Sequence, residues 1–364
     1  MEIACNRMDR GFKRYQEEFE AKALEILRSG YYILGKEVDA FESEFASFLG
    51  IPYCIGVGNG LSALQIAFHL LEIGKGDEVI VPANTYIASV LGVTLNDATP
   101  VFVEPDEFYN IDAGKIEEKI SERTRAILVV HLYGQAANMT EIMNIARKHN
   151  LRVVEDCAQS HGASYEGQQT GTFGDFGCFS FYPTKNLGAF GDGGALVTAD
   201  AKLADAVRVY RNYGSRKKYY NEMMGINSRL DEMQAGLLRV RLAHLDELNA
   251  ERKKMALYYQ EHIINSKFIL PRVRTGAEAV WHQYIVRVKE RDEIQQKLQR
   301  KGIGTMVHYP IPPHLSEALK YLNLQKGSYP ITECYADEVL SLPFYNGMLE
   351  EELQYVADVI NSFS

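Results

Sequence analysis

Two recurring patterns of apolar and polar residues occupy the first part of the chain. Short apolar runs typical of buried strands lie at residues 53–57, 78–81, 100–104, 126–130, 152–156 and 176–181. Apolar side chains at helical spacing lie at residues 13–29, 35–50, 62 onward, 84–95, 113–120, 138–149 and 201–210. Strands that alternate with helices predict a mostly parallel sheet with helices on both faces. Right-handed crossovers then bring the strand ends to one edge, where such sheets bind ligands.

The pattern changes after residue 230. A helical pattern runs from 230 to 262 with no proline, and a helix this long often links two domains. Beyond it, the spacing predicts strands at 280–288 and 304–309 and a helix at 290–300, and the segments 337–342 and 350–363 finish the chain. We therefore expect an α/β protein with a large domain over residues 1–244 and a smaller α/β domain over residues 245–364.

Composition narrows the choice of partners and compartment. The 364 residues carry a net charge of −9, which argues against nucleic acid or an anionic membrane as a partner. The five cysteines are scattered and include no C-x-x-C pair, as expected of reduced thiols in a cytosol. The N-terminus has no apolar signal core, and no apolar run reaches the length of a membrane span. A cytoplasmic location without membrane attachment is the expectation.

The stretch from Glu155 to Gly194 carries the candidate chemistry. Asp156 ends an apolar run, so its carboxylate is expected at the ligand-binding edge of the sheet. Lys185 follows Phe181, Tyr182 and Pro183, and partial desolvation beside them lowers a lysine pKa and leaves a nucleophilic amine. A lysine that forms a Schiff base and an Asp that keeps a pyridine nitrogen protonated are what pyridoxal 5'-phosphate requires.

Either residue alone has a more ordinary interpretation. A lone lysine is usually a solvated surface residue, and a lone Asp after a strand is usually a turn residue or helix cap. The two motifs together change this weighing. E-D-C-A-Q-S-H-G-A at 155–163 followed by S-F-Y-P-T-K-N-L-G at 180–188 resembles the DegT/DnrJ/EryC1/StrS sugar aminotransferases, which have the aspartate aminotransferase fold (fold type I). The resemblance extends over about residues 30–345.

This resemblance implies a transaminase that uses pyridoxal 5'-phosphate, with Lys185 as the catalytic residue that holds the cofactor and moves the proton. It implies glutamate as the amino donor and a nucleotide-linked keto sugar as the acceptor. The segment 213–232 looks most like members that aminate dTDP-linked 3-keto-6-deoxyhexoses, which gives a dTDP-3-amino-3,6-dideoxyhexose. It further implies a homodimer with shared active sites, in which Asn227 reaches the partner's cofactor phosphate.

Further site residues follow from matching positions in the family. Residues 58–62 form a Gly-rich turn before a helix, a ready phosphate site, although a plain strand-to-helix turn fits equally well. Tyr86 is expected to stack on the cofactor ring, as aromatic residues do on flat rings. The resemblance assigns cofactor contacts to Gly60, Leu61, Ser62, Tyr86, Asp156, Gln159, Ser180, Lys185 and Asn227. It assigns substrate contacts to His308 and Tyr309.

Other interpretations remain open from the sequence. Gly58, Gly60 and Ala63 fit the G-x-G-x-x-A dinucleotide fingerprint, which would make the chain an NAD-dependent sugar oxidoreductase. The acidic residue that should end the following strand is missing, however, and Pro82-Ala83-Asn84 stands there.

Aminotransferases acting on UDP-4-keto sugars or cyclitols share the cofactor motifs. A silent regulatory protein or a pyridoxamine-dependent dehydratase is expected to lack the lysine. No metal is expected, since Cys157 and His161 have no second ligand pair at zinc-like spacing.

Overall fold

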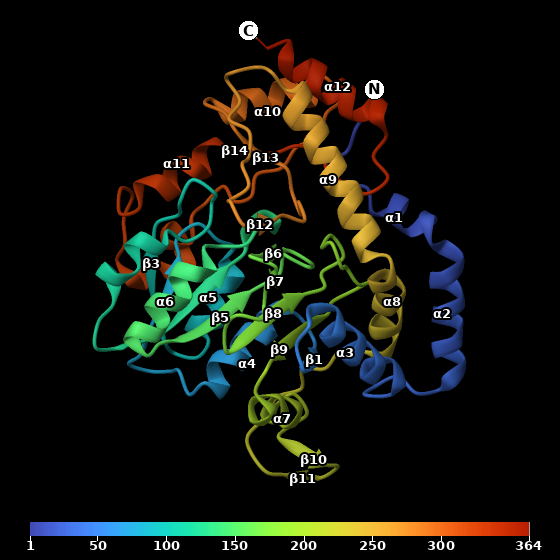
Figure 1. Ribbon diagram of the computed structural model, residues 1–364, viewed down its shortest axis with the longest axis vertical. Helices are drawn as coiled ribbons and strands as arrows, with labels where there is room; N and C mark the ends of the chain where they lie inside the picture. Colours follow the sequence, from blue (N-terminus) through green and yellow to red (C-terminus); the bar gives the residue numbers. More distant parts are fainter. Residues whose placement is uncertain (364) are drawn as a thin grey trace.

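A seven-stranded sheet forms the centre of the computed structural model, which describes residues 1–363 (Figure 1). Its strands lie in the order β1-β9-β8-β5-β4-β2-β3. Their bounds are β1 Tyr53–Val57, β2 Glu78–Pro82, β3 Thr99–Val103, β4 Thr124–Val130, β5 Arg152–Asp156, β8 Phe176–Ser180 and β9 Gly194–Thr198. Strand β9 runs antiparallel to both of its neighbours, and the pairs from β8 to β3 are parallel. The predicted mostly parallel sheet is confirmed, whereas β9 was not anticipated.

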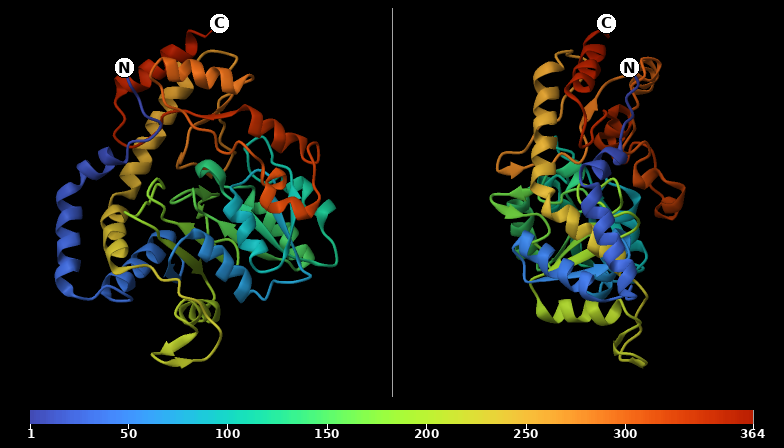
Figure 2. Two further views of the ribbon diagram at one scale, coloured as in Figure 1. Left: turned by 180° about the vertical axis from the view of Figure 1, so that it is seen from behind. Right: turned by 90° about the vertical axis from the view of Figure 1, so that its right-hand side faces the viewer.

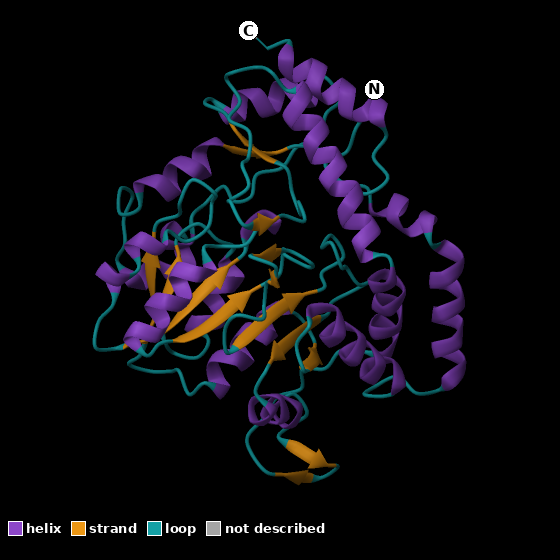
Figure 3. Cartoon of the chain, in the orientation of Figure 1, coloured by secondary structure: helices purple, strands orange, loops and turns teal. Residues whose placement is uncertain are grey.

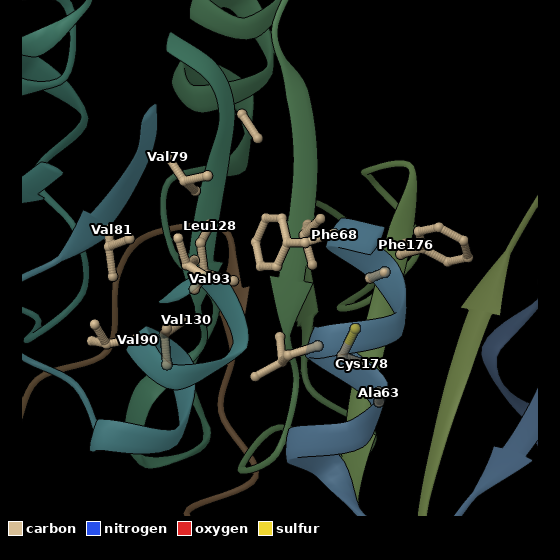
Figure 4. Close-up of a cluster of buried hydrophobic side chains, with 14 of the residues drawn as sticks. Ala63, Phe68, Val79, Val81, Val90, Val93, Leu128, Val130, Phe176 and Cys178 are labelled. Carbon is tan, nitrogen blue, oxygen red and sulfur yellow. The ribbon is translucent and has the colours of Figure 1, made fainter. Parts of the chain in front are cut away.

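Helices cover both faces of this sheet because successive strand residues point to opposite sides. In β4, Leu128 and Val130 belong to one apolar core, while Ile127 and Val129 belong to another. The first core packs against α4 (Gly60–Leu70), α5 (Ile87–Thr94) and α7 (Ala201–Tyr210), as Figure 4 shows for part of it. The opposite face is covered by α6 (Met139–His149) and, over β8 and β9, by α3 (Lys36–Leu49) and α8 (Glu232–Ala243).

The C-terminal third builds a separate apolar core. It contains α9 (Leu245–His262), α10 (Arg291–Arg300), α12 (Glu350–Asn361) and the paired strands β13 (Ile285–Arg287) and β14 (Val339–Ser341). Ile3 lies in this core too, and its N–H donates to the Gly302 carbonyl at 2.8 Å. The two chain ends accordingly lie at the same end of the molecule (Figure 2). The division near residue 245 stays a prediction, and the N-terminal residues pack with the C-terminal part.

The remaining elements are short or peripheral (Figure 3). A hairpin of β10 (Ser215–Lys217) and β11 (Tyr220–Asn221) projects from the body next to α7 (Figures 1 and 2). A small sheet joins β6 (Ser164–Tyr165), β7 (Gln168–Gln169) and β12 (Ala277–Glu278). Helix α11 spans Pro330–Glu338. Within residues 1–363, no helix combines the length and apolar character needed to cross a bilayer.

Three predicted helices differ from the structure. The helix expected at 13–29 is two helices, α1 (Met8–Arg14) and α2 (Gln16–Ser29), which are separated at Tyr15. The long helix expected at 230–262 breaks at His244 into α8 and α9, and the His244 ring stacks on Tyr15 at 3.9 Å between ring centroids. The helix expected at 113–120 is two turns of 3₁₀ helix, Ala113–Lys115 and Glu117–Lys119. In the first two cases the apolar pattern continues across the break. The two breaks lie at Tyr15 and His244, whose rings contact each other.

Two predicted strands are wrong over most of their length. Of residues 280–288, only Ile285–Arg287 pair as a strand. Val280 and His282 donate instead to the carbonyls of Gly134 and Tyr133, and Trp281 has a left-handed backbone with φ of 50°. Of residues 304–309, only Met306 makes a bridge, to Ser341. Both segments leave regular structure where they reach the cavity described next.

Candidate active site

A cavity of about 560 Å³ lies at the edge of the sheet where the parallel strands end. Its walls come from the turns after β1, β2, β4, β5 and β8 and from two C-terminal segments around residues 282 and 308. This is the ligand-binding edge of an open α/β sheet. The cavity brings together these predicted site residues: Gly60, Leu61, Tyr86, Asp156, Gln159, Ser180, Lys185, His308 and Tyr309.

Asp156 lies at the floor of the cavity as the last residue of β5. Its Oδ2 accepts a hydrogen bond from Ser89 Oγ at 2.7 Å, and its Oδ1 accepts one from the Ala158 N–H at 3.1 Å. Thr85 Oγ1 lies 2.7 Å from Ser89 Oγ. Because Ser89 gives its single proton to the carboxylate, Thr85 must donate to Ser89. Burial raises the pKa of Asp156, and the hydrogen bonds from Ser89 and Ala158 oppose that rise.

Lys185 lies in the loop that follows β8, where its N–H donates to the Tyr182 carbonyl at 2.8 Å. The loop closes tightly, because a Cβ at Gly188 would lie 2.4 Å from the Pro183 carbonyl oxygen. Burial lowers the pKa of Lys185 to about 8, while the attraction of Asp156 acts in the opposite direction. A substantial fraction of the amine is therefore neutral near physiological pH, and the neutral amine is the nucleophile.

The N-terminus of α4 forms another wall. Gly60 packs so closely on Ser180 that a Cβ on the glycine would lie 2.7 Å from Ser180 Cβ. The N–H groups of Gly60 and Leu61 belong to the first helical turn and have no intrahelical acceptor, so they suit an anionic ligand. Ser62 differs from expectation: it does not line the cavity, and its N–H donates to Asn59 Oδ1 at 2.8 Å as part of the helix cap.

Aromatic and polar side chains also line the cavity. The rings of Tyr86 and Tyr309 lie 5.0 Å apart at 31°, and Tyr86 is half exposed. Gln159 Nε2 donates to the Tyr309 hydroxyl at 3.1 Å, and Gln159 Oε1 accepts from the Tyr133 N–H at 2.7 Å. His308 Nδ1 lies 2.6 Å from Ser341 Oγ, and burial lowers the pKa of His308 to about 4. Its ring is therefore neutral at physiological pH.

Comparison with known proteins identifies the family. The profile of the DegT/DnrJ/EryC1/StrS aminotransferase family matches residues 13–361. The chain belongs to this family. It is a sugar aminotransferase that depends on pyridoxal 5'-phosphate, and its fold is that of the fold-type-I aminotransferases.

Individual relatives cover nearly the whole chain. The dTDP-3-amino-3,6-dideoxy-alpha-D-galactopyranose transaminase of Aneurinibacillus thermoaerophilus is 54% identical over 351 residues, 96% of each chain. The UDP-N-acetyl-3-dehydro-alpha-D-glucosamine 3-aminotransferase of Acidithiobacillus ferrooxidans is 45% identical over 92% of this chain and 90% of its own. The crystal structure of S. venezuelae DesV with a ketimine intermediate superposes with a TM-score of 0.97 at 45% identity, covering 99% of this chain and 98% of DesV.

Asn227 of the aminotransferase lies outside the cavity formed by its own chain. The residue is exposed, and its Nδ2 donates to the Tyr213 hydroxyl at 2.9 Å. It does not cap the following helix, because Asp231 holds the N-cap position of α8. The basic cluster at residues 216–218 is also outside the cavity, and Arg216 of the exposed hairpin pairs with Asp205 of α7 and with Glu222.

One buried cluster near the cavity has the residue types of a metal site. His131, Glu155 and Cys157 lie close enough together for a metal ion. Glu155, however, already accepts from His131 Nε2 at 2.9 Å and from the backbone N–H groups of residues 171, 173 and 174. His131 Nδ1 accepts from the Ala137 N–H, so Nε2 carries the proton that goes to Glu155. The cluster is a saturated hydrogen-bond network, and its donors and acceptors are in use.

The sequence analysis missed several polar residues of the cavity, among them Thr85, Ser89 and His282. Thr85 and Ser89 flank Tyr86 in a stretch that was examined only for its aromatic residue. His282 lies inside the segment that was predicted to be a strand. No pattern along the chain connects Ser89 with Asp156, because the two residues are 67 positions apart and meet only when α5 packs against the sheet.

Proposed function

We propose that this aminotransferase moves an amino group from glutamate to a dTDP-linked 3-keto-6-deoxyhexose and so produces a dTDP-3-amino-3,6-dideoxyhexose. The observation that carries this proposal is the 54% identity, over 96% of both chains, to a transaminase named for such an amino sugar. A second relative at 45% identity is also named for amination at carbon 3, although its nucleotide is UDP. Carbon 3 is therefore the common element of the two names.

The cavity fits the cofactor of the family. Bound pyridoxal 5'-phosphate supplies an electrophilic carbon and an electron-accepting ring. The structure offers a partly neutral lysine, a buried carboxylate and a helix N-terminus within one cavity. Lys185 would hold the cofactor and then, once released as a free amine, move the proton at the reacting carbon.

Asp156 would keep the pyridine nitrogen of the cofactor protonated. This role requires that the carboxylate stay ionised although it is buried, and burial alone favours the neutral acid. The Ser89 hydroxyl and the Ala158 N–H supply the hydrogen bonds that stabilise the anion. Ser89 and Thr85 therefore act through Asp156 as positioning residues.

The other cavity residues would contact three different groups: the cofactor phosphate, the cofactor ring and the sugar. The N–H groups of Gly60 and Leu61 and the hydroxyl of Ser180 would bind the cofactor phosphate, whereas the Ser62 N–H is already bonded to Asn59. Tyr86 would stack on the cofactor ring, and Gln159 would contact the ring substituents. His308 and Tyr309 come from the C-terminal part of the chain and would contact the sugar.

A homodimer with shared sites is the assembly that we propose. Asn227 is exposed and does not line its own cavity, which leaves it free to reach a second copy of the chain. Large apolar side chains are exposed on α2, just after α2, and in and next to the β10–β11 hairpin, at Leu24, Leu27, Tyr31, Tyr32, Tyr219, Tyr220 and Met224. Exposed apolar groups of this kind mark protein interfaces. The five cysteines carry no disulfide, which supports a cytoplasmic location.

The substrate proposal can be tested with the purified enzyme. dTDP-3-keto-6-deoxyhexose and a UDP-4-keto sugar would be offered separately with glutamate, and the amino sugar formed would be identified by mass spectrometry and NMR. The proposal expects a 3-amino sugar from the dTDP substrate only. Efficient formation of a 4-amino sugar would contradict it. Nicotinamide reduction by the enzyme would instead support the oxidoreductase interpretation of the Gly58-x-Gly60 turn.

A further inference from the structure

His282 is a buried histidine in the cavity wall whose two ring nitrogens lie in different surroundings. Its Nδ1 lies 3.1 Å from Asn186 Oδ1, the side chain directly after the catalytic lysine. Its Nε2 has no hydrogen-bond partner within residues 1–363 and is not sealed from the cavity. The residue is only 6% exposed, so the ring presents little more than this edge.

A chain of amide groups fixes the tautomer of His282. The carbonyl oxygen of His161 is an acceptor without ambiguity, and it binds Asn249 Nδ2 at 2.9 Å. Asn249 Oδ1 therefore faces Asn186 Nδ2, which also donates to the Val280 carbonyl. Asn186 must then offer its oxygen to His282. It follows that Nδ1 of His282 carries the proton and that Nε2 has a free lone pair.

The ring of His282 keeps this lone pair over the working pH range. Burial lowers its pKa far below the usual value, and the neighbouring charges of Lys185 and Arg252 act in the same direction. His308 and His161 are the other titratable groups that affect it, and burial lowers their pKa values as well. His282 is accordingly a permanent hydrogen-bond acceptor that cannot become a donor at Nε2.

The backbone holds His282 as firmly as the side chain does. Its N–H donates to the Tyr133 carbonyl at 3.0 Å, and its carbonyl accepts from Arg252 Nη1 at 3.1 Å. The approach to the 133–134 turn is so close that a Cβ at Gly134 would lie 2.6 Å from the His282 nitrogen. Functional groups held in this way lose little entropy when a ligand binds.

We propose that His282 Nε2 accepts a hydrogen bond from a hydroxyl group of the sugar ring and so selects and orients the sugar substrate. The inference rests on the proposed nucleotide-sugar substrate. Each ring hydroxyl of a sugar has a proton to donate. Apart from the α-amino group, which is the group transferred to the cofactor, the amino-acid donor presents carboxylates, which have no proton to donate. An acceptor-only atom therefore distinguishes the two substrates that share this cavity.

Two substitutions of His282 test the contributions of its two ring nitrogens separately. In His282→Asn, the amide nitrogen takes the place of Nδ1 and can still donate to Asn186, but nothing replaces Nε2. In His282→Gln, the amide extends to the Nε2 position and can present its oxygen there. The two half-reactions would be measured separately in single turnovers, with glutamate on the cofactor-loaded enzyme and with the keto sugar on the aminated enzyme.

The sugar half-reaction is expected to lose about 10- to 100-fold in kcat/KM in His282→Asn, the usual cost of a buried hydroxyl without an acceptor. The glutamate half-reaction should be unchanged, and His282→Gln should recover most of the loss. Sugar analogues that each lack one ring hydroxyl complete a double-mutant cycle. With the wild type, the analogue that lacks the bound hydroxyl should react about 10- to 100-fold more slowly than the full sugar. With His282→Asn, this analogue and the full sugar should react at the same rate.

His161→Asn is the matched control, because His161 is buried near Lys185 but does not line the cavity. Any change it causes should be equal in both half-reactions. An equal loss in both half-reactions of His282→Asn, or no loss in either, would overturn the inference. If His282→Asn does not fold, the analogue cycle with His282→Ala, which has no acceptor at the Nε2 position, decides in its place. If the wild type reacts with glutamate but aminates no nucleotide-linked keto sugar, the proposed function fails and the inference fails with it.

Discussion

Replacing Ser89 with alanine tests whether the hydroxyl pair of Thr85 and Ser89 in the cavity wall keeps Asp156 ionised. The substitution removes the donor to Asp156 Oδ2 and leaves the Ala158 N–H as the other hydrogen bond to the carboxylate. Ser89 is 1% exposed, and at this depth water is poorly placed to replace the hydroxyl. In the variant, the ionised form of the Asp156 carboxylate has a higher free energy, and the carboxylate takes up a proton more readily.

The magnitude follows from the type of hydrogen bond. A hydrogen bond to a charged group contributes about 1.5–3 kcal/mol. Up to this amount is lost from the interaction of ionised Asp156 with a protonated pyridine, so the affinity for pyridoxal 5'-phosphate should fall by as much as about 10- to 150-fold. Thr85→Val removes only a bond between two neutral hydroxyls, worth about 1 kcal/mol, and should cost about fivefold.

The assay combines cofactor affinity with the pH profile of turnover. The Ser89 hydrogen bond favours the ionised form of Asp156, so its loss raises the pKa of that carboxyl further. The acid limb, where activity disappears as pH falls and Asp156 takes up a proton, should therefore move to higher pH in Ser89→Ala. Ser89→Thr retains a hydroxyl and should restore the wild-type limb.

A control and a contradicting result complete this test. Ser160 is a second fully buried serine, and its hydroxyl accepts from Thr170 Oγ1 without contacting Asp156. Ser160→Ala should affect stability but leave the acid limb in place. If Ser89→Ala keeps both the cofactor affinity and the acid limb of the wild type, Asp156 does not depend on Ser89 and our account of the buried carboxylate is wrong.

The remaining predictions concern the lysine, the aspartate and the assembly. Borohydride should fix the cofactor to Lys185, and Lys185→Ala should lose both the covalent link and turnover; a trapped peptide with another lysine would contradict this. Protein stripped of cofactor should react with pyridoxal 5'-phosphate faster as pH rises and level off above about pH 8, because the pKa of Lys185 is lowered to about 8 and the neutral amine attacks. Asp156→Ala should keep its fold, as judged by circular dichroism, and lose about 10²–10³ in rate. Mixing Lys185→Ala with Asn227→Ala subunits should restore activity if Asn227 acts across the interface, since one site of a mixed dimer then carries neither defect; a site formed within one subunit predicts no recovery.

The central sheet could be predicted from the sequence because its strands are buried on both faces. The run at 53–57 coincides with β1, and the runs at 78–81 and 152–156 agree with β2 and β5 to within one residue. Strands of this kind appear as short continuous apolar runs, and their carboxyl ends locate cavity residues such as Asp156. The motif around Lys185 needed no knowledge of packing, because its residues are contiguous in the chain.

Strand β9 and helix α11 could not be found in the same way. Gly194–Thr198 is apolar, but its antiparallel direction is set by pairing with β1 and β8, which are distant in the sequence. Helix α11 begins at Pro330 and depends on a distant cap: Glu104, just after β3, accepts from the N–H groups of Ile331 and Thr332 at 2.8 and 2.9 Å. Contacts between residues so far apart in the sequence leave no periodic signal along the chain.

The two strands that were wrongly predicted explain how the cavity acquires its polar wall. A regular strand over 280–288 would continue its ladder through residues 280–284 and fix alternate side chains on opposite faces. In the structure, the left-handed backbone of Trp281 interrupts that alternation, and the N–H groups of Val280 and His282 bond instead to the carbonyls of the 133–134 turn. The hydrogen bonds of the backbone are thus satisfied, and His282 lies against Asn186 with one nitrogen open to the cavity. The local preference of the sequence for a strand is overridden at the place where side chains converge on the cavity, which is where such conflicts are expected in a functional protein.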